Sequence, residues 1–272
     1  MTTSREIRGF LVSFAVQMTK RRPIIGGNWK MNTDLESGML LAGAVADHMD
    51  VCDCCEVVIY PPFLYLQAID SVIDQGSLQL GAQDIWYEAD GAYTGEVSVA
   101  MLKDVGVTSV LVGHSERRHI LGETDSLIAK KANASINGGF QTVLCVGETL
   151  DQREEEKTLD IVLGQVKSGL QSTEAQSMHK VVIAYEPVWA IGTGKTASPE
   201  DAQSVHKAIR ECICDLYDES IANILRIQYG GSVKPDNAAE LFSCPDIDGA
   251  LVGGAALSAD SFNAIVAAAC ES

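Results

Sequence analysis

The chain has 272 residues, of which 46% are hydrophobic and 21% are charged. This ordinary globular mixture excludes the collagen-like, low-complexity and disordered classes, and the length suits one or two domains or a single α/β barrel of about 250 residues. Twenty Lys and Arg against 37 Asp and Glu leave a net charge of −17, which argues against nucleic acid or an anionic membrane as the main partner.

Residues 1–22 differ from the rest, because basic residues surround a short apolar run from Gly9 to Val16. The run is too short to span a bilayer, which needs about 20 residues. The segment fits a targeting peptide, a helical addition to the domain, or residues upstream of a true start at Met18. We favour the start at Met18, because the folded pattern begins after Pro23. The sequence thus predicts an N-terminal extension, 1–22, and a folded domain, 23–272.

Short apolar runs alternate with longer amphipathic stretches from Pro23 onward. Continuous apolar runs are typical of strands buried on both faces of a parallel sheet. Between them, a helix is predicted over Ser126–Asn137, ended by glycines, and another begins at the N-cap Ser198. The predicted strands are Ile24–Asn28, Val57–Tyr60, Leu78–Gln83, Ser109–Gly113, Thr142–Val146, Val181–Tyr185, Arg226–Tyr229 and Gly249–Val252.

Eight β-then-α units follow one another without a linker or a change of composition. This order predicts an α/β fold of the single closed (β/α)₈ barrel type. The alternative is a doubly wound open sheet, which usually has fewer strands and a topological switch point.

The eight cysteines allow a disulfide framework, but the chain is long and no convincing signal peptide precedes it. We therefore expect reduced thiols and a cytoplasmic protein. The cluster Cys52–Cys55 has no second pair at zinc-finger spacing and only His48 nearby, so we predict no metal site. For this cluster and for Cys212 and Cys214, packing is a simpler interpretation than thiol regulation.

Polar residues follow several predicted strands at the end where barrel reaction sites are built. Asn28 and Lys30 follow the first strand, His114 and Glu116 the fourth, and Glu186 the sixth. Alone, the lysine could be a solvated side chain and the histidine a core residue. Together, a base, an imidazole and a cation form a working set. A carboxylate leaving an apolar strand is partly desolvated, which raises its pKa and makes it a better base.

Two glycine-rich turns follow the last two predicted strands. They are Gly230-Gly231-Ser232 and Gly253-Gly254. Either could be only a tight loop, but backbone N–H groups at these places often hold a phosphate.

The stretch 190–196 carries two misleading patterns. It ends like a nucleotide-binding P-loop, but Trp189 occupies the position that needs glycine. It also fits a permissive dinucleotide fingerprint, but four residues separate it from its strand. We interpret it as a mobile lid, with Gly192 and Gly194 allowing the backbone to reshape.

Six segments resemble the triosephosphate isomerase family, in the expected order and over Pro23 to the C-terminus. They are Asn28–Asn32, Gly91–Glu96, Gly113–Arg118, Ala184–Gly194, Tyr229–Val233 and Leu251–Ala255.

The resemblance implies a role for each polar residue at the predicted rim. Glu186 matches the base that moves a proton between two carbons of a triose phosphate. His114 matches a neutral imidazole that polarises the carbonyl, Lys30 a cation that stabilises the enediolate, and Glu116 its nearby carboxylate. Asn28 matches a substrate hydrogen-bond donor. The reaction would interconvert dihydroxyacetone phosphate and glyceraldehyde 3-phosphate, in glycolysis and gluconeogenesis.

The resemblance also implies that backbone amides hold the phosphate, and that no cofactor or metal takes part. The matching positions are Gly192, Ser232, Gly253 and Gly254. The alternative from another class is a catalytically dead barrel that only binds a phosphate ligand, since fold alone does not fix function.

A long loop, 83–96, carries Trp86, Tyr87 and Tyr93, and exposed aromatic residues suggest an interface. In the resembling family this loop enters a partner subunit, so a homodimer is implied, with Thr94 near the site that contains Asn28 and Lys30. The alternative is a loop that folds onto its own barrel.

Overall fold

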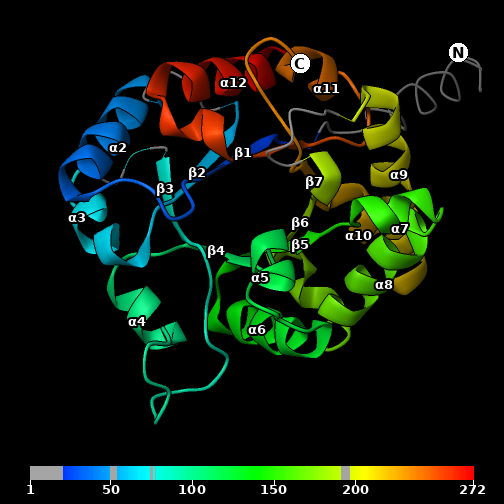
Figure 1. The fold of residues 1–272 in the computed structure, drawn as a ribbon, viewed down its shortest axis with the longest axis horizontal. Coiled ribbons are helices and arrows are strands. Elements are labelled where there is room, and N and C mark those ends of the chain that lie inside the picture. Colours follow the sequence, from blue (N-terminus) through cyan, green and yellow to red (C-terminus); the bar gives the residue numbers. More distant parts are fainter. Residues whose placement is uncertain (1–20, 50–53, 74–75, 77, 191–196) are drawn as a thin grey trace, which may run out of the picture.

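A closed barrel of parallel strands forms the centre of the molecule, and helices surround it (Figure 1). The computed structural model describes residues 21–49, 54–73, 76, 78–190 and 197–272. Strands pair in chain order, and β8 returns to pair with β1. The strands in these residues are β1 (Ile24–Asn28), β2 (Glu56–Tyr60), β3 (Leu78–Ala82), β4 (Ser109–Val112), β5 (Gln141–Val146), β6 (Val181–Tyr185), β7 (Arg226–Tyr229) and β8 (Gly249–Val252).

The predicted (β/α)₈ barrel is confirmed, and the open-sheet alternative is wrong, because the first and last strands are joined. Four strands have the predicted bounds and the other four differ by one residue at one end. Gly113 lies after β4 because its φ of 73° leaves the extended conformation.

Helices and short 3-10 turns connect the strands on the outside. Ser198 caps α9, where its side chain accepts a hydrogen bond from the Asp201 N–H, and the predicted helix at Ser126 runs from Asp125 to Gly138. The α-helices are α2 (Leu35–Met49), α3 (Leu66–Asp70), α4 (Val99–Asp104), α5 (Ser115–His119), α6 (Asp125–Gly138), α7 (Leu150–Glu154), α8 (Thr158–Leu170), α9 (Pro199–Leu216), α10 (Glu219–Ile224), α11 (Ala238–Phe242) and α12 (Ala259–Glu271). The 3-10 helices are η1 (Phe63–Tyr65), η2 (Ala175–Lys180), η3 (Val188–Ala190) and η4 (Gly254–Leu257).

In most strands, alternate residues belong to two different apolar clusters. Leu111 and Val143 belong to a cluster inside the barrel, whereas Val112 and Leu144 belong to a larger cluster between the barrel and the helices. Both faces of the strands are thus buried, which explains their continuous apolar sequences.

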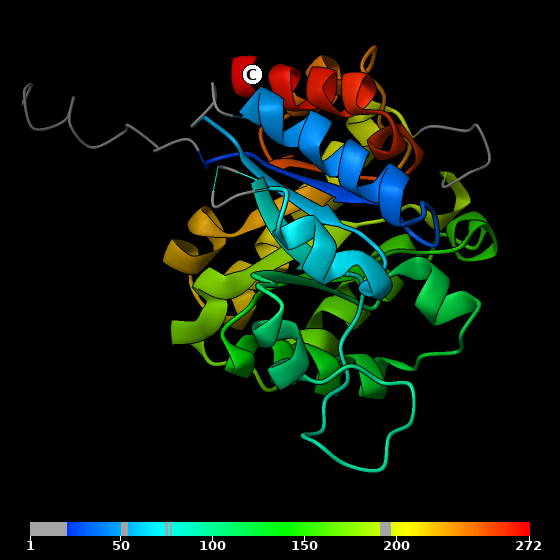
Figure 2. The ribbon, with the colours of Figure 1, turned by 90° about the vertical axis from the view of Figure 1, so that its left-hand side faces the viewer.

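The two ends of the folded chain meet beside β1. This strand lies between β2 and β8, and α12 packs against α2 and β1 (Figure 2). Arg21 and Arg22 already contact the barrel, since they donate hydrogen bonds to Asp248 and to the carbonyl of Cys55. Barrel contacts therefore begin before the predicted boundary at residue 23.

One thiol prediction is wrong. Cys54, just before β2, and Cys270, in α12, form a disulfide with a Cα–Cα distance of 5.5 Å. The two residues are 216 positions apart, and only closure of the barrel brings them together, so local spacing could not reveal the pair. Cys55 and Cys212 are buried and Cys214 is exposed, all as free thiols, while Cys52 lies outside the described residues.

The segment between β3 and α4 extends well away from the barrel (Figures 1 and 2). Its base is closed by a hydrogen bond from the Trp86 N–H to the carbonyl of Val97, at 2.8 Å. Tyr93 and Thr94 are exposed. The loop therefore does not fold back over its own barrel, contrary to one alternative. None of the helices in the described part of the chain combines the length and apolar character needed to cross a membrane.

Candidate active site

A hollow of about 580 Å³ opens at the end of the barrel where the strands finish. Parallel strands all present their carboxyl ends at this edge, so residues from distant parts of the sequence converge there. The hollow is lined by Asn28, Lys30, His114, Glu186, Gly230, Gly231, Ser232, Val233, Lys234, Leu251, Gly253, Gly254 and Ala255. Every predicted site residue except Glu116 and Gly192 is among them.

Glu186 and His114 touch in this hollow, although they follow different strands. Oε1 of Glu186 lies 2.9 Å from Nε2 of His114, and both side chains are buried. Oε2 of Glu186 accepts a hydrogen bond of 2.9 Å from the backbone N–H of Ser115. Both carboxylate oxygens therefore have defined partners.

The pKa of Glu186 moves against the direction expected from burial. Burial raises it, but the nearby His114 ring and the Ser115 N–H outweigh burial and hold the pKa below its usual value. Glu186 is therefore ionised at neutral pH, as a general base must be. The upward shift expected from the sequence is wrong, because it considered the apolar strand without the partner at 2.9 Å.

The hydrogen bonds of His114 assign its tautomer. Its Nδ1 accepts a hydrogen bond of 3.2 Å from the Glu116 N–H, so this nitrogen carries no proton. The ring proton is then on Nε2, where it is donated to Glu186. Burial lowers the pKa of His114 and the Glu186 carboxylate raises it, with a net rise. The Glu186 carboxylate thus favours a charged ring, whereas the Glu116 N–H favours an Nδ1 without a proton, because a proton there would break its hydrogen bond.

Lys30 is held in an unusual backbone conformation with φ of 54°. The Asn28 side-chain oxygen accepts the Lys30 N–H at 3.0 Å, and Gln83 donates to the Lys30 carbonyl at 2.7 Å. These bonds offset the cost of a left-handed conformation for a residue with a Cβ, on the order of 1 kcal/mol. Nζ of Lys30 pairs with Oε1 of Glu116 at 2.5 Å, so the predicted cation and its carboxylate are in contact.

Two glycines leave room for the Glu186 segment. A Cβ on Gly230 would lie 2.7 Å from Cγ of Glu186, and one on Gly147 would lie 1.7 Å from the Glu186 carbonyl oxygen. Only glycine allows the neighbouring chains to approach this closely.

The glycine-rich turns form another wall of the hollow. Gly253 precedes η4, and Gly254 is its first residue. In the other turn, Asn237 donates a hydrogen bond of 3.0 Å to the Ser232 carbonyl. Residues 191–196 lie outside the described residues, so the structure tests neither Gly192 nor the predicted lid.

Three contributors were not found by reasoning from the sequence. Gln83 positions Lys30, and Lys234 brings a second cation to the hollow. Arg118 donates to the carbonyls of Gly113 and Cys145 at 2.8 and 3.1 Å, which ties the turn before His114 to β5. Lys234 could have been found in the sequence, because it stands two positions after Ser232 in the predicted phosphate turn. Nothing in the sequence shows the contacts of Gln83 and Arg118.

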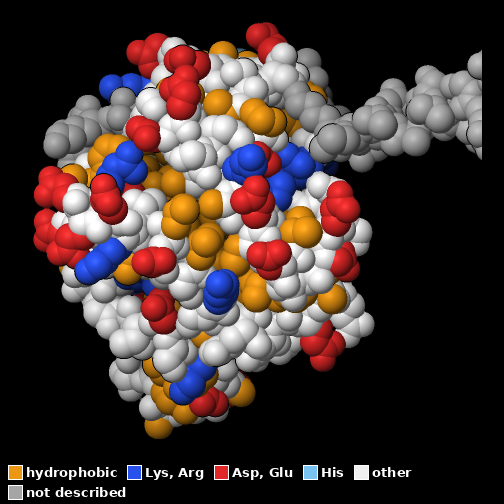
Figure 3. All heavy atoms as spheres, turned by 90° about the vertical axis from the view of Figure 1, so that its right-hand side faces the viewer, with side chains coloured by type: hydrophobic (Ala, Val, Ile, Leu, Met, Phe, Trp, Pro, Cys, Tyr) orange, Lys and Arg blue, Asp and Glu red, His pale blue; other side chains and the backbone are white. Residues whose placement is uncertain are grey.

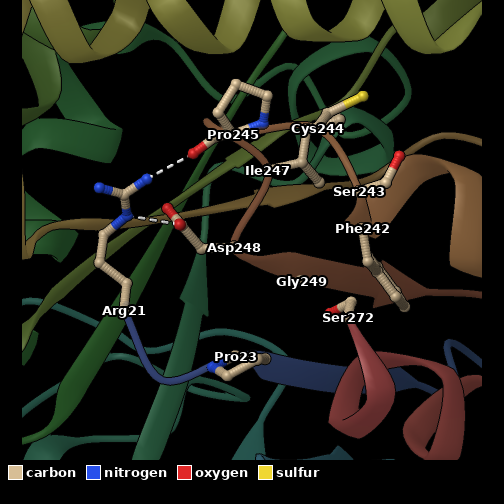
Figure 4. A pocket seen from close by; sticks show the side chains of 10 residues that line it. All are labelled: Arg21, Pro23, Phe242, Ser243, Cys244, Pro245, Ile247, Asp248, Gly249 and Ser272. Carbon is tan, nitrogen blue, oxygen red and sulfur yellow. Dashed lines mark hydrogen bonds and ion pairs between the residues drawn. The ribbon is translucent and has the colours of Figure 1, made fainter. Parts of the chain in front are cut away.

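A second hollow of about 310 Å³ lies at the opposite end of the barrel (Figure 4). Arg21 crosses its edge and donates hydrogen bonds to Asp248 at 2.5 Å and to the Pro245 carbonyl at 2.6 Å. Asp248 also accepts bonds from Arg210 and from the Ile227 N–H. The charged groups at this hollow are therefore already paired with one another. The hollow lined by Glu186 and His114 is the better candidate for the active site. Within the described residues, no group of three or more His, Cys, Asp or Glu is arranged to hold a metal ion.

Comparison with known proteins agrees with this geometry. The family model described as "Triosephosphate isomerase" matches residues 23–269. The chain belongs to the triosephosphate isomerase family.

Curated members of the triosephosphate isomerase family match nearly the whole chain. The protein of Chloroherpeton thalassium is 51% identical over 250 residues, which cover 92% of this chain and 99% of that protein. The protein of Rhodopirellula baltica is 49% identical, with 92% and 98% covered, and that of Thermoanaerobacter pseudethanolicus is 51% identical, with 90% and 99% covered. All three are named triosephosphate isomerase.

Proposed function

We propose that this chain interconverts dihydroxyacetone phosphate and D-glyceraldehyde 3-phosphate through an enediolate, as an aldose–ketose isomerase of glycolysis and gluconeogenesis. The observation that carries the proposal is the contact of 2.9 Å between the buried Glu186 carboxylate and the His114 ring, in a hollow that also holds Lys30. A carboxylate base beside an imidazole donor and a cation suits proton transfer next to a carbonyl.

Glu186 is the proposed base. It takes a proton from the carbon beside the substrate carbonyl and returns it to the neighbouring carbon. Both of its oxygens are engaged with His114 and Ser115 before substrate binds, so the side chain must release at least one of these partners to reach a carbon. The low pKa of Glu186 keeps it ionised for the first transfer.

His114 and Lys30 stabilise the charge that develops on the substrate oxygens. The Nε2–H of His114 donates to the oxygen of the enediolate, and its neutral ring can move a proton between two oxygens of similar basicity. The ammonium of Lys30 supplies the positive charge, and Glu116 holds that ammonium. Asn28 binds substrate and also fixes the Lys30 backbone.

The phosphate is assigned to the glycine-rich wall. Ser232, Gly253 and Gly254 line the hollow, and the backbone N–H groups of such turns can hold a phosphate. Gly192 is assigned to the same phosphate from the sequence resemblance alone. The chemistry proposed here uses no cofactor and no metal.

A catalytically dead phosphate-binding barrel finds no support. Such a protein would be free to lose the base, the imidazole or the lysine, whereas Glu186, His114 and Lys30 line one hollow.

The experiment is a coupled assay of both triose phosphates with wild type, Glu186→Asp, Glu186→Gln and His114→Gln. Wild type should convert both substrates, Glu186→Gln should lose almost all activity, and Glu186→Asp should retain a small part. Removing a general base typically costs about 10²–10⁴-fold. Equal activity in wild type and both Glu186 variants would contradict the proposal. Larger phosphosugars in the same assay test the substrate class.

We also propose that the chain forms a homodimer through the loop 83–96. Large apolar side chains are exposed on the segments that follow the first four strands. Met31 is 96% and Leu64 85% exposed, and Ile120 and Tyr93 are exposed as well. In Figure 3, apolar side chains gather at the lower end of the molecule, where Figures 1 and 2 place this loop. Such a patch favours association, with Thr94 of a second copy near Asn28 and Lys30.

We assign residues 23–272 to the catalytic barrel and residues 1–22 to an N-terminal extension. The substrates are water-soluble metabolites, so a cytoplasmic location fits the proposed reaction.

A further inference from the structure

The disulfide Cys54–Cys270 lies across the place where the barrel closes. Cys54 precedes β2, and Cys270 is in the last turn of α12, the helix that follows β8. Because β1 lies between β8 and β2, the bridge joins the elements on its two sides.

The helix that carries Cys270 packs closely on β1. The Phe262 ring of α12 lies so near to Gly27 of β1 that a Cβ on Gly27 would come within 3.1 Å of it. Phe262 is fully buried. A bridge that fixes the end of α12 therefore restrains the helix that covers β1 (Figure 2).

The two bridged residues are also more exposed than the buried cysteines Cys55 and Cys145. Cys54 is exposed and Cys270 is half-buried. The next residue, Cys55, is buried, and burial raises the pKa of its thiol to about 12. Burial also raises the pKa of the Cys145 thiol well above its usual value. Since the thiolate is the reactive form, these two thiols are poor competitors for exchange.

We propose that Cys54 and Cys270 form a reversible redox-modification site, which exchanges with low-molecular-weight disulfides and dithiols and fastens the barrel closure when oxidised. In the oxidising direction, the two protein thiols and one external disulfide give the Cys54–Cys270 bond and two external thiols. One S–S bond forms, the external S–S bond breaks, and two protons pass to the departing thiolates. In the reducing direction, an external dithiol attacks the sulfur of Cys54, the more exposed residue of the pair, and leaves as its own disulfide, while the two protein thiols are released.

The bridge acts on stability more than on the reaction. It closes a loop of 216 positions, and a cross-link that restricts so much of the unfolded chain raises the unfolding temperature by roughly 5–12 °C in a protein of this size. It lies at the end of the barrel where the strands begin, away from Glu186 and His114. The proposal therefore does not rest on the proposed isomerase activity.

The test uses the full-length chain, equilibrated with either oxidised glutathione or dithiothreitol. After alkylation and peptide mapping, Cys54 and Cys270 should be protected in the oxidised sample and alkylated in the reduced one. Reduction should lower the unfolding temperature by roughly 5–12 °C. Cys270→Ser should unfold at the temperature of the reduced wild type in both conditions, and the exposed-thiol control Cys214→Ser should keep the full difference.

Two results would overturn the proposal. One is that Cys54 and Cys270 remain open to alkylation after oxidation. The other is that reduction shifts the unfolding temperature of Cys270→Ser as much as that of wild type. Both readouts are independent of activity, so a failure here is distinct from a failure of the isomerase proposal.

Discussion

Replacing Gly230 with alanine tests how closely the active site depends on space beside Glu186. The new methyl group would lie 2.7 Å from Cγ of Glu186 and 3.2 Å from the Tyr185 carbonyl oxygen. Ordinary contact begins at 3.4 Å, so the first of these pairs must separate by about 0.7 Å. The Glu186 side chain is held by His114 and Ser115, so the movement displaces the proposed base from its partners.

Misplacing a reacting group by about 1 Å can cost about 10²-fold in rate. We therefore expect kcat/KM of Gly230→Ala to fall on the order of 10²-fold, equivalent to about 2.7 kcal/mol of transition-state stabilisation. Overpacking should also lower the free energy of unfolding by about 1–3 kcal/mol.

The assay is steady-state kinetics with dihydroxyacetone phosphate, alongside urea unfolding to confirm that the variant is folded. Gly164→Ala in α8 is the matched control, because a Cβ at Gly164 meets nothing within 4 Å. It should keep wild-type kcat/KM and gain about 0.5–1 kcal/mol in stability. A Gly230→Ala protein within about threefold of wild-type kcat/KM would refute the reasoning.

Three further predictions concern stability, positioning and assembly. Burial raises the pKa of Asp84 to about 6, despite its contacts with Lys131 and Arg117. The folded state therefore binds this proton more tightly than the unfolded chain does. The resulting stabilisation is complete below pH 4 and is lost as the pH rises towards 6. In urea unfolding, wild type should lose roughly 3 kcal/mol relative to Asp84→Asn across that interval, and parallel pH profiles would contradict this. Arg118→Met should lower the free energy of unfolding by about 2 kcal/mol, because the carbonyls of Gly113 and Cys145 lose their donor. The variant should also lower kcat more than it raises KM. An unchanged kcat would show that the turn before His114 keeps its position without the guanidinium. Tyr93→Asp should lower the sedimentation coefficient towards that of a monomer. Leu216→Asp, at a position of similar exposure on α9, should leave it unchanged. Equal sedimentation of the two variants would contradict an interface at the loop 83–96.

Much of the barrel could be predicted because its strands are buried on both faces. Runs such as Val181–Tyr185 are apolar throughout, and their bounds coincide with the observed strand. The position of the candidate site followed from the same pattern, since parallel strands present their carboxyl ends together. Because His114 and Glu186 each follow one of these strands, the sequence alone predicts that they lie at the same edge.

Features that depend on exact distances could not be predicted. The pKa of Glu186 is governed by a partner at 2.9 Å that follows another strand, and burial alone gave the wrong direction. The Gln83 bond to Lys30 joins residues 53 positions apart, and the Cys54–Cys270 bridge joins residues 216 apart. Contacts of this range depend on the closed barrel, so no local pattern reports them.

Proton transfer by Glu186 is tested most directly by running the isomerisation of dihydroxyacetone phosphate in D₂O and analysing the product by NMR. A carboxylate that takes a proton from one carbon and returns it to the next can exchange that proton with solvent. We predict deuterium at C2 of part of the glyceraldehyde 3-phosphate formed by wild type, and neither conversion nor labelling by Glu186→Gln. Conversion by wild type with no deuterium in the product, or labelling at an undiminished rate by Glu186→Gln, would contradict the account.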